Sequence, residues 1–246
     1  MSKFVGSYRV RISDVDSKGR LKLAALLSLM QEAASTHADQ IGVGHARLKE
    51  LGVGWALSKS TLSFKRLPRW RERITITTWP SKRTAVSTDR EFIITDEKGE
   101  LVATARTLFV LFDLKARRIA RLSVLGQWPN VLEFADDTDF ERPQFPQEGA
   151  LLQSDFGVRK DDIDLNNHVN NAVYITWAME PLSLEFCLNH EPQSIGMWFL
   201  QEVFPGERIA ASCRVLGEQS FHILSSGQTE RTRVVVRWKD ARQCDC

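Results

Sequence analysis

The chain has 246 residues, and 33 Lys plus Arg against 31 Asp plus Glu give a net charge of +2. Such a nearly balanced charge does not indicate a nucleic-acid-binding protein. No uninterrupted apolar run approaches the ~20 residues of a membrane-spanning helix. The N-terminus resembles neither a signal peptide nor a transit peptide, so we expect a cytoplasmic protein without a membrane span.

The first half is predicted to contain a strand, one long helix and a run of strands. In the helical segment 21–41, apolar residues recur every three to four positions, which is typical of a helix with one buried face. The turn sequence 96–99, Asp-Glu-Lys-Gly, predicts a hairpin between the last two strands. The strands are expected at 4–12 and near 55–66, 72–79, 86–96 and 101–113.

The second half repeats this order after a linker. Residues 129–150 contain three prolines, one glycine and an acidic run, a composition typical of an interdomain segment. We therefore expect an N-terminal domain at 1–128 and a C-terminal domain at 151–246. In the second domain a helix is predicted at 170–189, with strands at 153–160 and near 195–204, 207–216, 219–226 and 229–239.

One apolar helix followed by several antiparallel strands has a simple packing solution. The sheet curls around the helix and buries its broad apolar side. This is the hotdog architecture, so the sequence predicts an α+β protein built as a tandem, or double, hotdog.

The two halves also align with each other without a gap at an offset of 148 positions. The identical pairs suggest a tandem duplication. They are Val10/Val158, Arg11/Arg159, Asp14/Asp162, Asp16/Asp164, Ala24/Ala172 and Glu32/Glu180. Where the second copy has Asn166 and His168, the first has Lys18 and Arg20. Because a pure folding requirement would more naturally appear in both copies, the residues peculiar to the second copy are candidates for function.

The segment 162–171, Asp-Ile-Asp-Leu-Asn-Asn-His-Val-Asn-Asn, is the most polar part of this alignment. Asn and Asp side chains favour turns and helix starts, because they accept hydrogen bonds from unpaired backbone amides. His168 beside Asp164 and Asn166 offers a proton-transfer group, an orienting carboxylate and an amide donor. Backbone amides at 169–171, at the expected helix start, are candidates for an oxyanion hole.

These residues resemble a known family of hydrolases. Residues 164–171, Asp-Leu-Asn-Asn-His-Val-Asn-Asn, followed by Tyr174-Ile-x-Trp177, are similar to a signature of the acyl-acyl-carrier-protein thioesterases. That family has a double-hotdog fold and ends fatty-acid synthesis by releasing the free acid. Shorter matches, such as Trp55-Ala-Leu-Ser and Val236-Arg-Trp238-Lys, extend the resemblance over roughly Tyr8 to Lys239.

The resemblance implies a catalytic role for Asp164, Asn166 and His168. It also implies a glutamate on the strand after the second helix, where Phe199-Leu-Gln-Glu202 matches the family and nominates Glu202. If that register is wrong, the carboxylate is Glu207. Whether Glu202 acts as a general base or as a covalent nucleophile stays open. No cofactor and no metal is expected, because the reaction needs none and no ligand spacing suggests one.

We therefore expect a thioesterase acting on acyl-acyl-carrier-protein, with the acyl carrier protein as its partner. An acyl-CoA thioesterase of the same fold and a non-hydrolytic acyl-binding protein remain alternatives. Two basic segments, 65–73 and 115–121, are either solvated faces or docking surfaces for an acidic partner. The preferred acyl chain and the oligomeric state, a homodimer included, are not legible from the residues.

Overall fold

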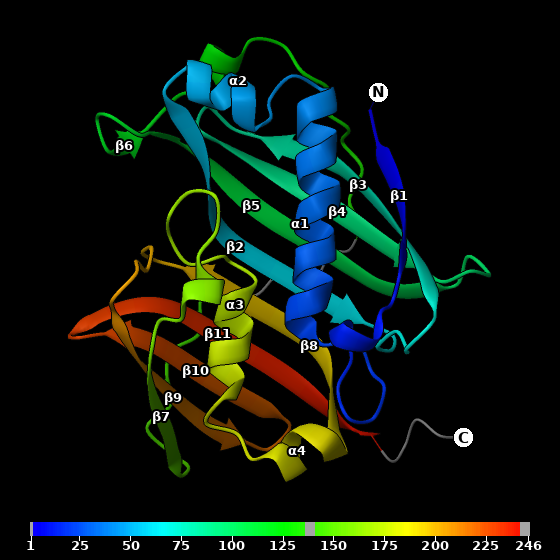
Figure 1. Ribbon diagram of the computed structural model, residues 1–246, viewed down its shortest axis with the longest axis vertical. Coiled ribbons are helices and arrows are strands. Elements are labelled where there is room, and N and C mark those ends of the chain that lie inside the picture. The colour runs from blue at the N-terminus through cyan, green and yellow to red at the C-terminus, as the bar shows by residue number, and fades with distance from the viewer. Residues whose placement is uncertain (1, 136–140, 242–246) are drawn as a thin grey trace. The chain divides into compact units, whose positions relative to one another are not determined.

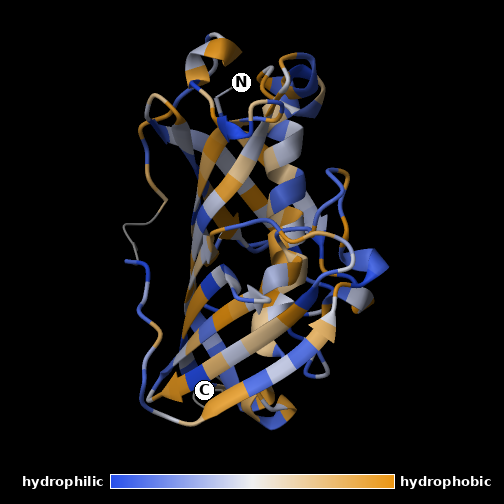
Figure 2. Cartoon of the chain, turned by 90° about the vertical axis from the view of Figure 1, so that its left-hand side faces the viewer, coloured by the Kyte–Doolittle hydropathy of each residue, from blue (hydrophilic) through white to orange (hydrophobic). Residues whose placement is uncertain are grey.

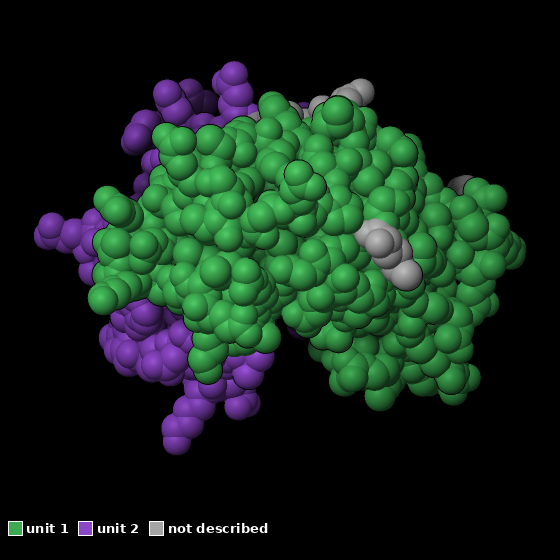
Figure 3. Space-filling model, turned by 90° about the horizontal axis from the view of Figure 1, so that it is seen from above, with its two compact units in different colours: residues 1–138 green, residues 139–246 purple. Residues whose placement is uncertain are grey.

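The computed structural model describes residues 2–135 and 141–241 (Figure 1). The chain forms two compact units, Met1–Thr138 and Asp139–Cys246, which Figure 3 shows in separate colours. The division falls inside the expected linker 129–150, although residues 136–140 lie outside the described part. Among the described residues, no helix is long and apolar enough to cross a membrane.

Unit 1 is an antiparallel sheet with the long helix α1 against it. The strands run in the order β1-β3-β4-β5-β2, and the short β6 pairs with β5. The elements are β1 (Phe4–Arg9), α1 (Leu23–Gln40), α2 (His45–Glu50), β2 (Val53–Phe64), β3 (Arg73–Arg83), β4 (Ser87–Thr95), β5 (Leu101–Asp113) and β6 (Arg118–Ile119). Short 3₁₀ turns lie at Ile12–Asp14 and Leu122–Leu125.

The helix α1 buries one face, as its sequence period predicts. Leu26, Met30, Ala33 and His37 are its buried residues, spaced four, three and four positions apart. The helix contacts β1 and β3 and lies along the sheet in Figure 1. Because Leu26 is 1% exposed, its replacement by Ala would cost about 2–5 kcal/mol in the free energy of unfolding.

Unit 2 repeats the sheet with a different helical part. Its strands run in the order β8-β11-β10-β9-β7, again antiparallel. The elements are β7 (Leu151–Gly157), α3 (Val173–Met179), α4 (Leu184–Asn189), β8 (His190–Phe199), β9 (Arg208–Leu216), β10 (Gln219–Ser226) and β11 (Thr229–Asp240), with a 3₁₀ turn at Lys160–Asp162. Hydrophobic and hydrophilic residues alternate along many of the strands, as Figure 2 shows.

The single helix predicted over 170–189 is wrong. It is divided into α3 and α4, because Pro181 has no amide hydrogen to continue the helical bonds and its ring clashes with the preceding turn. The hydroxyl of Ser183 then caps α4 by accepting a hydrogen bond from the Phe186 amide at 3.1 Å. Strand β8 consequently begins at His190, five residues before the expected start.

Each unit thus places helix against an antiparallel sheet, which is the hotdog arrangement, and the chain is an α+β tandem hotdog. In unit 2, α3 contacts β9, β10 and β11, and α4 contacts β8. The short elements α2 and β6 were not predicted. Both are too short for their sequence period to stand out from the neighbouring charged residues.

Candidate active site

The polar segment 162–171 forms a tight loop that returns on itself. The Asp164 amide donates to the His168 carbonyl at 2.9 Å, and the Asn167 amide donates to the Asp164 carbonyl at 3.0 Å. Asn167 adopts a left-handed conformation with φ of 62°, which Asn tolerates better than most residues. This turn brings the side chains of Asp164 and His168 to the same place.

His168 lies between two carboxylates. Its Nδ1 is 3.5 Å from Asp164 Oδ1, and its Nε2 is 3.7 Å from Glu202 Oε1. The side chains of His168 and Asp164 are 21% and 11% exposed, whereas that of Glu202 is 51% exposed. The imidazole therefore lies close to both carboxylates, and Glu202 is the one that solvent reaches more readily.

Asn166 is held by the same loop. Its backbone amide donates to Asp164 Oδ1 at 2.8 Å, and its side-chain Nδ2 lies 3.5 Å from Asp164 Oδ2. Asp164 thus contacts both other members of the predicted trio, which suits a residue that orients the group. The Asn166 side chain is exposed, so its amide is available to a substrate or a water molecule.

Glu202 comes from a distant part of the chain. It was predicted to lie on a strand, but β8 ends at Phe199 and Glu202 lies in the irregular segment before β9. The next residue, Val203, attaches this segment to the loop, because its carbonyl accepts the Val169 amide at 2.9 Å. Glu207, the alternative carboxylate, is instead ion-paired with Arg231 at 2.7 Å.

Tyr174 on α3 supports this arrangement, although its role was not predicted. The Val203 amide donates to the Tyr174 hydroxyl at 3.1 Å, and the phenol is 2% exposed. Burial raises the pKa of Tyr174, so the hydroxyl stays protonated. The signal in the sequence was its place in the motif Tyr174-Ile-x-Trp177, but no pattern in the chain linked it to Val203.

The prediction of an oxyanion hole at 169–171 is wrong for two of its amides. The Val169 amide is bonded to the Val203 carbonyl, and the Asn170 amide donates to the Asp162 carbonyl at 2.8 Å. The helix α3 begins only at Val173, after this segment. Both amides hold the loop together and are therefore not free to stabilise an oxyanion.

Unit 1 contains the same loop with different side chains. The Asp16 amide donates to the Arg20 carbonyl at 2.8 Å and the Lys18 amide to Asp16 Oδ1 at 2.9 Å, as at the positions 148 residues later. Arg20, which replaces histidine, is 4% exposed and forms an ion pair with Asp16 at 2.8 Å. The backbone is shared, but the imidazole is not.

The position of Glu202 also has a counterpart in unit 1. The Leu21 amide donates to the Pro68 carbonyl at 2.8 Å, just as the Val169 amide donates to Val203. The residue before Pro68 is Leu67, which is 7% exposed. Unit 1 therefore has a buried leucine where unit 2 has the exposed carboxylate of Glu202.

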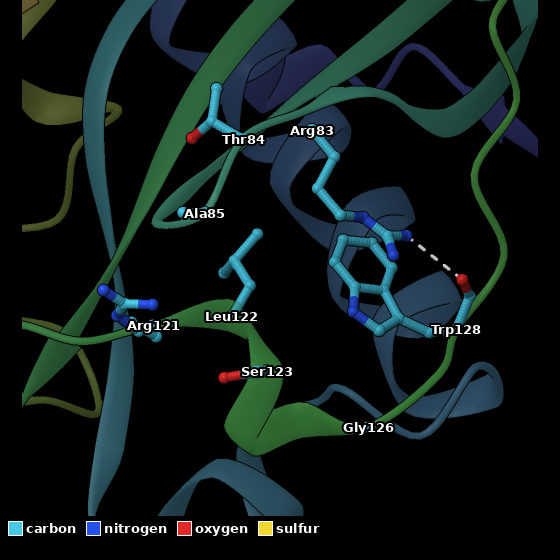
Figure 4. A pocket seen from close by; sticks show the side chains of 8 residues that line it. All are labelled: Arg83, Thr84, Ala85, Arg121, Leu122, Ser123, Gly126 and Trp128. Atoms are coloured by element: carbon cyan, nitrogen blue, oxygen red, sulfur yellow. Dashed lines mark hydrogen bonds between the residues drawn. The ribbon is translucent and has the colours of Figure 1, made fainter.

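Other features lie apart from this loop. Figure 4 shows a pocket of about 300 Å³ in unit 1, where the Arg83 guanidinium stacks 3.7 Å from the Trp128 ring centroid. The predicted catalytic residues do not line it. Within the described part of the chain, no group of three or more His, Cys, Asp or Glu side chains is arranged to hold a metal ion.

Comparison with known proteins follows the division into two halves. The model of the acyl-ACP thioesterase N-terminal domain matches residues 1–124, and that of the C-terminal domain matches residues 147–240. The chain belongs to the acyl-ACP thioesterase family. The resemblance inferred from residues 164–171 is confirmed.

Individual acyl-ACP thioesterases are similar over most of this chain. It is 26% identical over 212 residues to the oleoyl-acyl carrier protein thioesterase 1 of Arabidopsis thaliana, covering 78% of this chain and 58% of the relative. The chain thus spans little more than half the length of that plant protein. An oleoyl thioesterase structure from Lactobacillus plantarum, 25% identical, has a TM-score of 0.89 and covers 97% of this chain and 96% of that one.

The fold is also that of more distant members. The 12:0-ACP thioesterase of Umbellularia californica is 20% identical and has a TM-score of 0.86, with 97% of each chain covered. This likeness supports the tandem hotdog alone, because the identity is low.

Proposed function

We propose that this protein hydrolyses the thioester of an acyl-acyl-carrier-protein and releases the free fatty acid. Family membership supports the reaction class. The observation that carries the proposal for this chain is the imidazole of His168, which lies 3.5 Å from Asp164 and 3.7 Å from Glu202. At the corresponding positions unit 1 has Arg20 in its loop and Leu67 in the segment bonded to that loop, so the arrangement is not a requirement of folding.

The reaction adds water across the thioester carbon–sulfur bond. Oxygen attacks the carbonyl carbon, the carbon–sulfur bond breaks, and the thiolate takes a proton and leaves as the thiol. Glu202 either removes the proton from the attacking water or attacks the carbonyl itself. In the second case it forms an acyl-glutamyl anhydride as the thiolate leaves, and water then hydrolyses the anhydride to the free acid and restores the carboxylate. His168 transfers protons at this site, and Asp164 orients it.

Asn166 completes the group as a hydrogen-bond donor. Its exposed carboxamide would hold the substrate carbonyl or the attacking water, which an amide does through its NH₂ group. Since the Val169 and Asn170 amides are engaged, we propose that side chains carry more of the oxyanion stabilisation than the backbone does.

The two hotdogs have different roles in this proposal. Unit 2 supplies the catalytic side chains, and unit 1, whose loop lacks them, is assigned to binding the acyl chain. The acyl carrier protein is the proposed partner. No metal or cofactor enters the proposed reaction.

Two rivals are separated by one assay. The purified protein is given the same acyl chain on acyl carrier protein and on CoA, and free fatty acid and thiol are measured. We expect a higher kcat/KM on the carrier substrate; a higher value on CoA would favour an acyl-CoA thioesterase. Tight acyl binding without thiol release would favour a non-hydrolytic acyl-binding protein.

A product profile gives the next level of detail. Free fatty acids are extracted from a host that expresses the parent protein and from one that expresses His168→Ala. The acids that accumulate only with the parent identify the preferred acyl length and unsaturation.

A further inference from the structure

Arg231, on β11, contacts the segment that carries Glu202 through both its side chain and its backbone. Its Nη1 donates to Gln201 Oε1 at 3.0 Å and to the Glu202 carbonyl at 3.1 Å, and its Nη2 donates to Glu207 Oε2 at 2.7 Å. Its own carbonyl accepts the amides of Leu200 and Gln201 at 2.8 and 3.2 Å. One residue therefore holds the backbone just before Glu202 and at Glu202, and it pairs with the side chain of Glu207 after it.

The equivalent of Arg231 in unit 1 is a valine. The amides of Lys65 and Arg66 donate to the Val102 carbonyl at 2.9 and 3.4 Å, as those of Leu200 and Gln201 do to Arg231. Val102 is fully buried, with 0% exposure. Arg66 in turn occupies the position that corresponds to Gln201.

The arginine has thus changed place between the copies. In unit 1, Arg66 pairs with Glu72 at 2.9 Å. In unit 2, the corresponding Glu207 pairs with Arg231, which comes from another strand. Both copies keep the ion pair, so the pair itself does not explain why the arginine moved. What the move adds is the bond from a guanidinium to the Glu202 carbonyl.

Glu202 needs such an anchor. Its side chain is 51% exposed, so packing around the carboxylate does little to fix it. Its position against His168 depends on where its backbone is held. Tyr174 fixes the following amide, that of Val203, and Arg231 fixes the carbonyl of Glu202 itself. Bonds from a guanidinium are charge-assisted and stronger than neutral ones.

We propose that Arg231 is a positioning residue of the candidate active site, holding the Glu202 backbone so that the carboxylate lies against His168. The inference rests on the proposed function, because it assigns Arg231 a part in the same reaction. Unit 1 has no such requirement, because Leu67 offers no carboxylate to position.

The test exchanges the two arrangements. The double variant Gln201→Arg/Arg231→Val gives unit 2 the residues of unit 1, so Glu207 keeps an arginine partner while the Glu202 carbonyl loses its donor. We expect the melting temperature to stay close to that of the parent. We expect kcat on an acyl thioester to fall by about tenfold to a hundredfold, the scale of a misplaced catalytic group, with KM changing less.

A second readout does not depend on activity. The NMR signals of the His168 ring should shift in the double variant toward those of Glu202→Gln, because both changes remove the carboxylate from the imidazole. Arg66→Gln is the matched control: it removes the pairs with Glu72 and Asp96 in unit 1 and should leave both kcat on a small-thiol acyl thioester and the His168 signals unchanged. Arg231→Lys should recover part of kcat, because it keeps the charge but not the forked geometry.

The outcomes separate the two hypotheses. A stable double variant with parental kcat and parental His168 signals would overturn the positioning role. A double variant that loses activity because it unfolds would also overturn it, if the molecules that remain folded still show the parental His168 signals. A parent without activity on any acyl thioester would overturn the proposed function instead. In that case the NMR signals of His168 still show whether Arg231 holds the Glu202 carboxylate near the imidazole.

Discussion

The loop at Asp14–Leu21 in unit 1 and the loop at Asp162–Val169 in unit 2 have the same backbone. In both, the aspartate at the start accepts the amide of the arginine three residues earlier, at 3.1 Å in unit 1 and 2.8 Å in unit 2. In both, the turn closes through a residue with positive φ, Gly19 at 73° and Asn167 at 62°. The fold of this loop is therefore encoded by residues that both copies retain.

The chemistry differs at three side chains. Lys18, Arg20 and Leu67 in unit 1 stand where Asn166, His168 and Glu202 stand in unit 2. Arg20, whose side chain is 4% exposed, forms an ion pair with Asp16, so the unit 1 loop has a guanidinium where the unit 2 loop has an imidazole. The comparison teaches that Asp16 and Asp164 both hold the loop backbone. The functional difference between the copies lies at the neighbouring positions, Lys18 and Arg20 in unit 1 and Asn166 and His168 in unit 2.

The largest expected effect comes from removing the side chains peculiar to unit 2. His168→Ala and Asn166→Ala should each lower kcat by at least about 10²-fold, the usual scale for losing a proton-transfer group or an oxyanion donor. The melting temperature should change little, because Asn166 is exposed and the loop is held by backbone bonds. Thiol release from an acyl-carrier-protein substrate measures kcat. A folded His168→Ala protein with near-normal turnover contradicts the assignment.

The converse change tests whether the loop alone is sufficient. Lys18→Asn with Arg20→His gives unit 1 the two side chains of unit 2, but Leu67 still lacks a carboxylate. We expect no second active site, so the same change made in the His168→Ala background should not restore hydrolysis. It should lower stability, because Asp16 loses its arginine partner.

Replacing Glu202 and Glu207 should separate chemistry from support. Glu202→Gln keeps the shape and removes the negative charge, so turnover should fall by about 10²-fold with acyl binding largely retained. Glu207→Gln should instead lower the free energy of unfolding by about 2 kcal/mol, because it weakens charge-assisted bonds with Arg231. Chemical denaturation and kcat are measured for both. An active Glu202→Gln with a dead Glu207→Gln would mean that the wrong carboxylate was chosen.

Much of the fold and the location of the site were accessible from the sequence. Strands β2 to β5 and β9 to β11 lie within a few residues of their predicted bounds, because alternating or apolar runs between turn residues are strong local signals. The duplication pointed to 162–171, because the residues on both sides of this segment match those of the first copy whereas Asn166 and His168 do not. The correspondence of Glu202 with Leu67 lies outside this gap-free alignment and is defined by the bonds at Val203 and Pro68.

The misses have physical causes. The helix break at Pro181 was overlooked because the apolar period continues on both sides of it. The amides of Val169 and Asn170 were assigned to an oxyanion because no local signal shows that distant carbonyls already accept them. The contacts of Tyr174 and Arg231 join residues 29 apart, and Arg231 reaches across strands. Such contacts depend on tertiary packing, which a single sequence does not encode locally.

A buried histidine offers a comparison within the two sheets. His222 lies opposite Cys213 in β9–β10, where unit 1 has Phe92 opposite Thr78 in β3–β4. Burial lowers the pKa of His222 from 6.5 to about 4, and the proximity of the Ala178 backbone opposes this with a smaller upward effect. The unfolded chain therefore takes up a proton at higher pH than the folded one. Stability is present above pH 6.5 and is lost as the pH falls toward 4.

The exchange His222→Phe, which installs the unit 1 residue, should remove this pH dependence. By linkage the parent should lose about 3 kcal/mol between pH 6.5 and 4, an order-of-magnitude figure. The slope is the measurement, because phenylalanine is larger and the variant can differ from the parent at pH 7. Denaturation curves at pH 7, 5.5 and 4.5 suffice. Parallel slopes in both proteins would mean that the pKa of His222 is the same in the folded and unfolded states.

The smallest expected effect concerns the basic segments, which both belong to unit 1, whereas the candidate catalytic residues belong to unit 2. In 65–73, Arg66 is committed to Glu72 and Asp96 at 2.9 Å each, and Arg71 stacks on Trp70. In 115–121, the side chains are exposed at every basic position. Segment 115–121 therefore exposes more positive charge to an acidic carrier protein than segment 65–73 does.

Charge reversal separates docking from chemistry. Arg117→Glu/Arg118→Glu should lower kcat/KM on acyl-acyl-carrier-protein by about tenfold at low salt, and Arg69→Glu/Arg71→Glu should lower it less. Hydrolysis of a short acyl thioester on a small thiol should barely change, because the reacting atoms are the same. The loss should shrink as salt rises to physiological strength, where the screening length is about 8 Å. Equal losses on both substrates would indicate damaged folding. If kcat/KM on the carrier substrate is unchanged in both variants, these charges are only solvent-exposed, and the acyl-CoA alternative is strengthened.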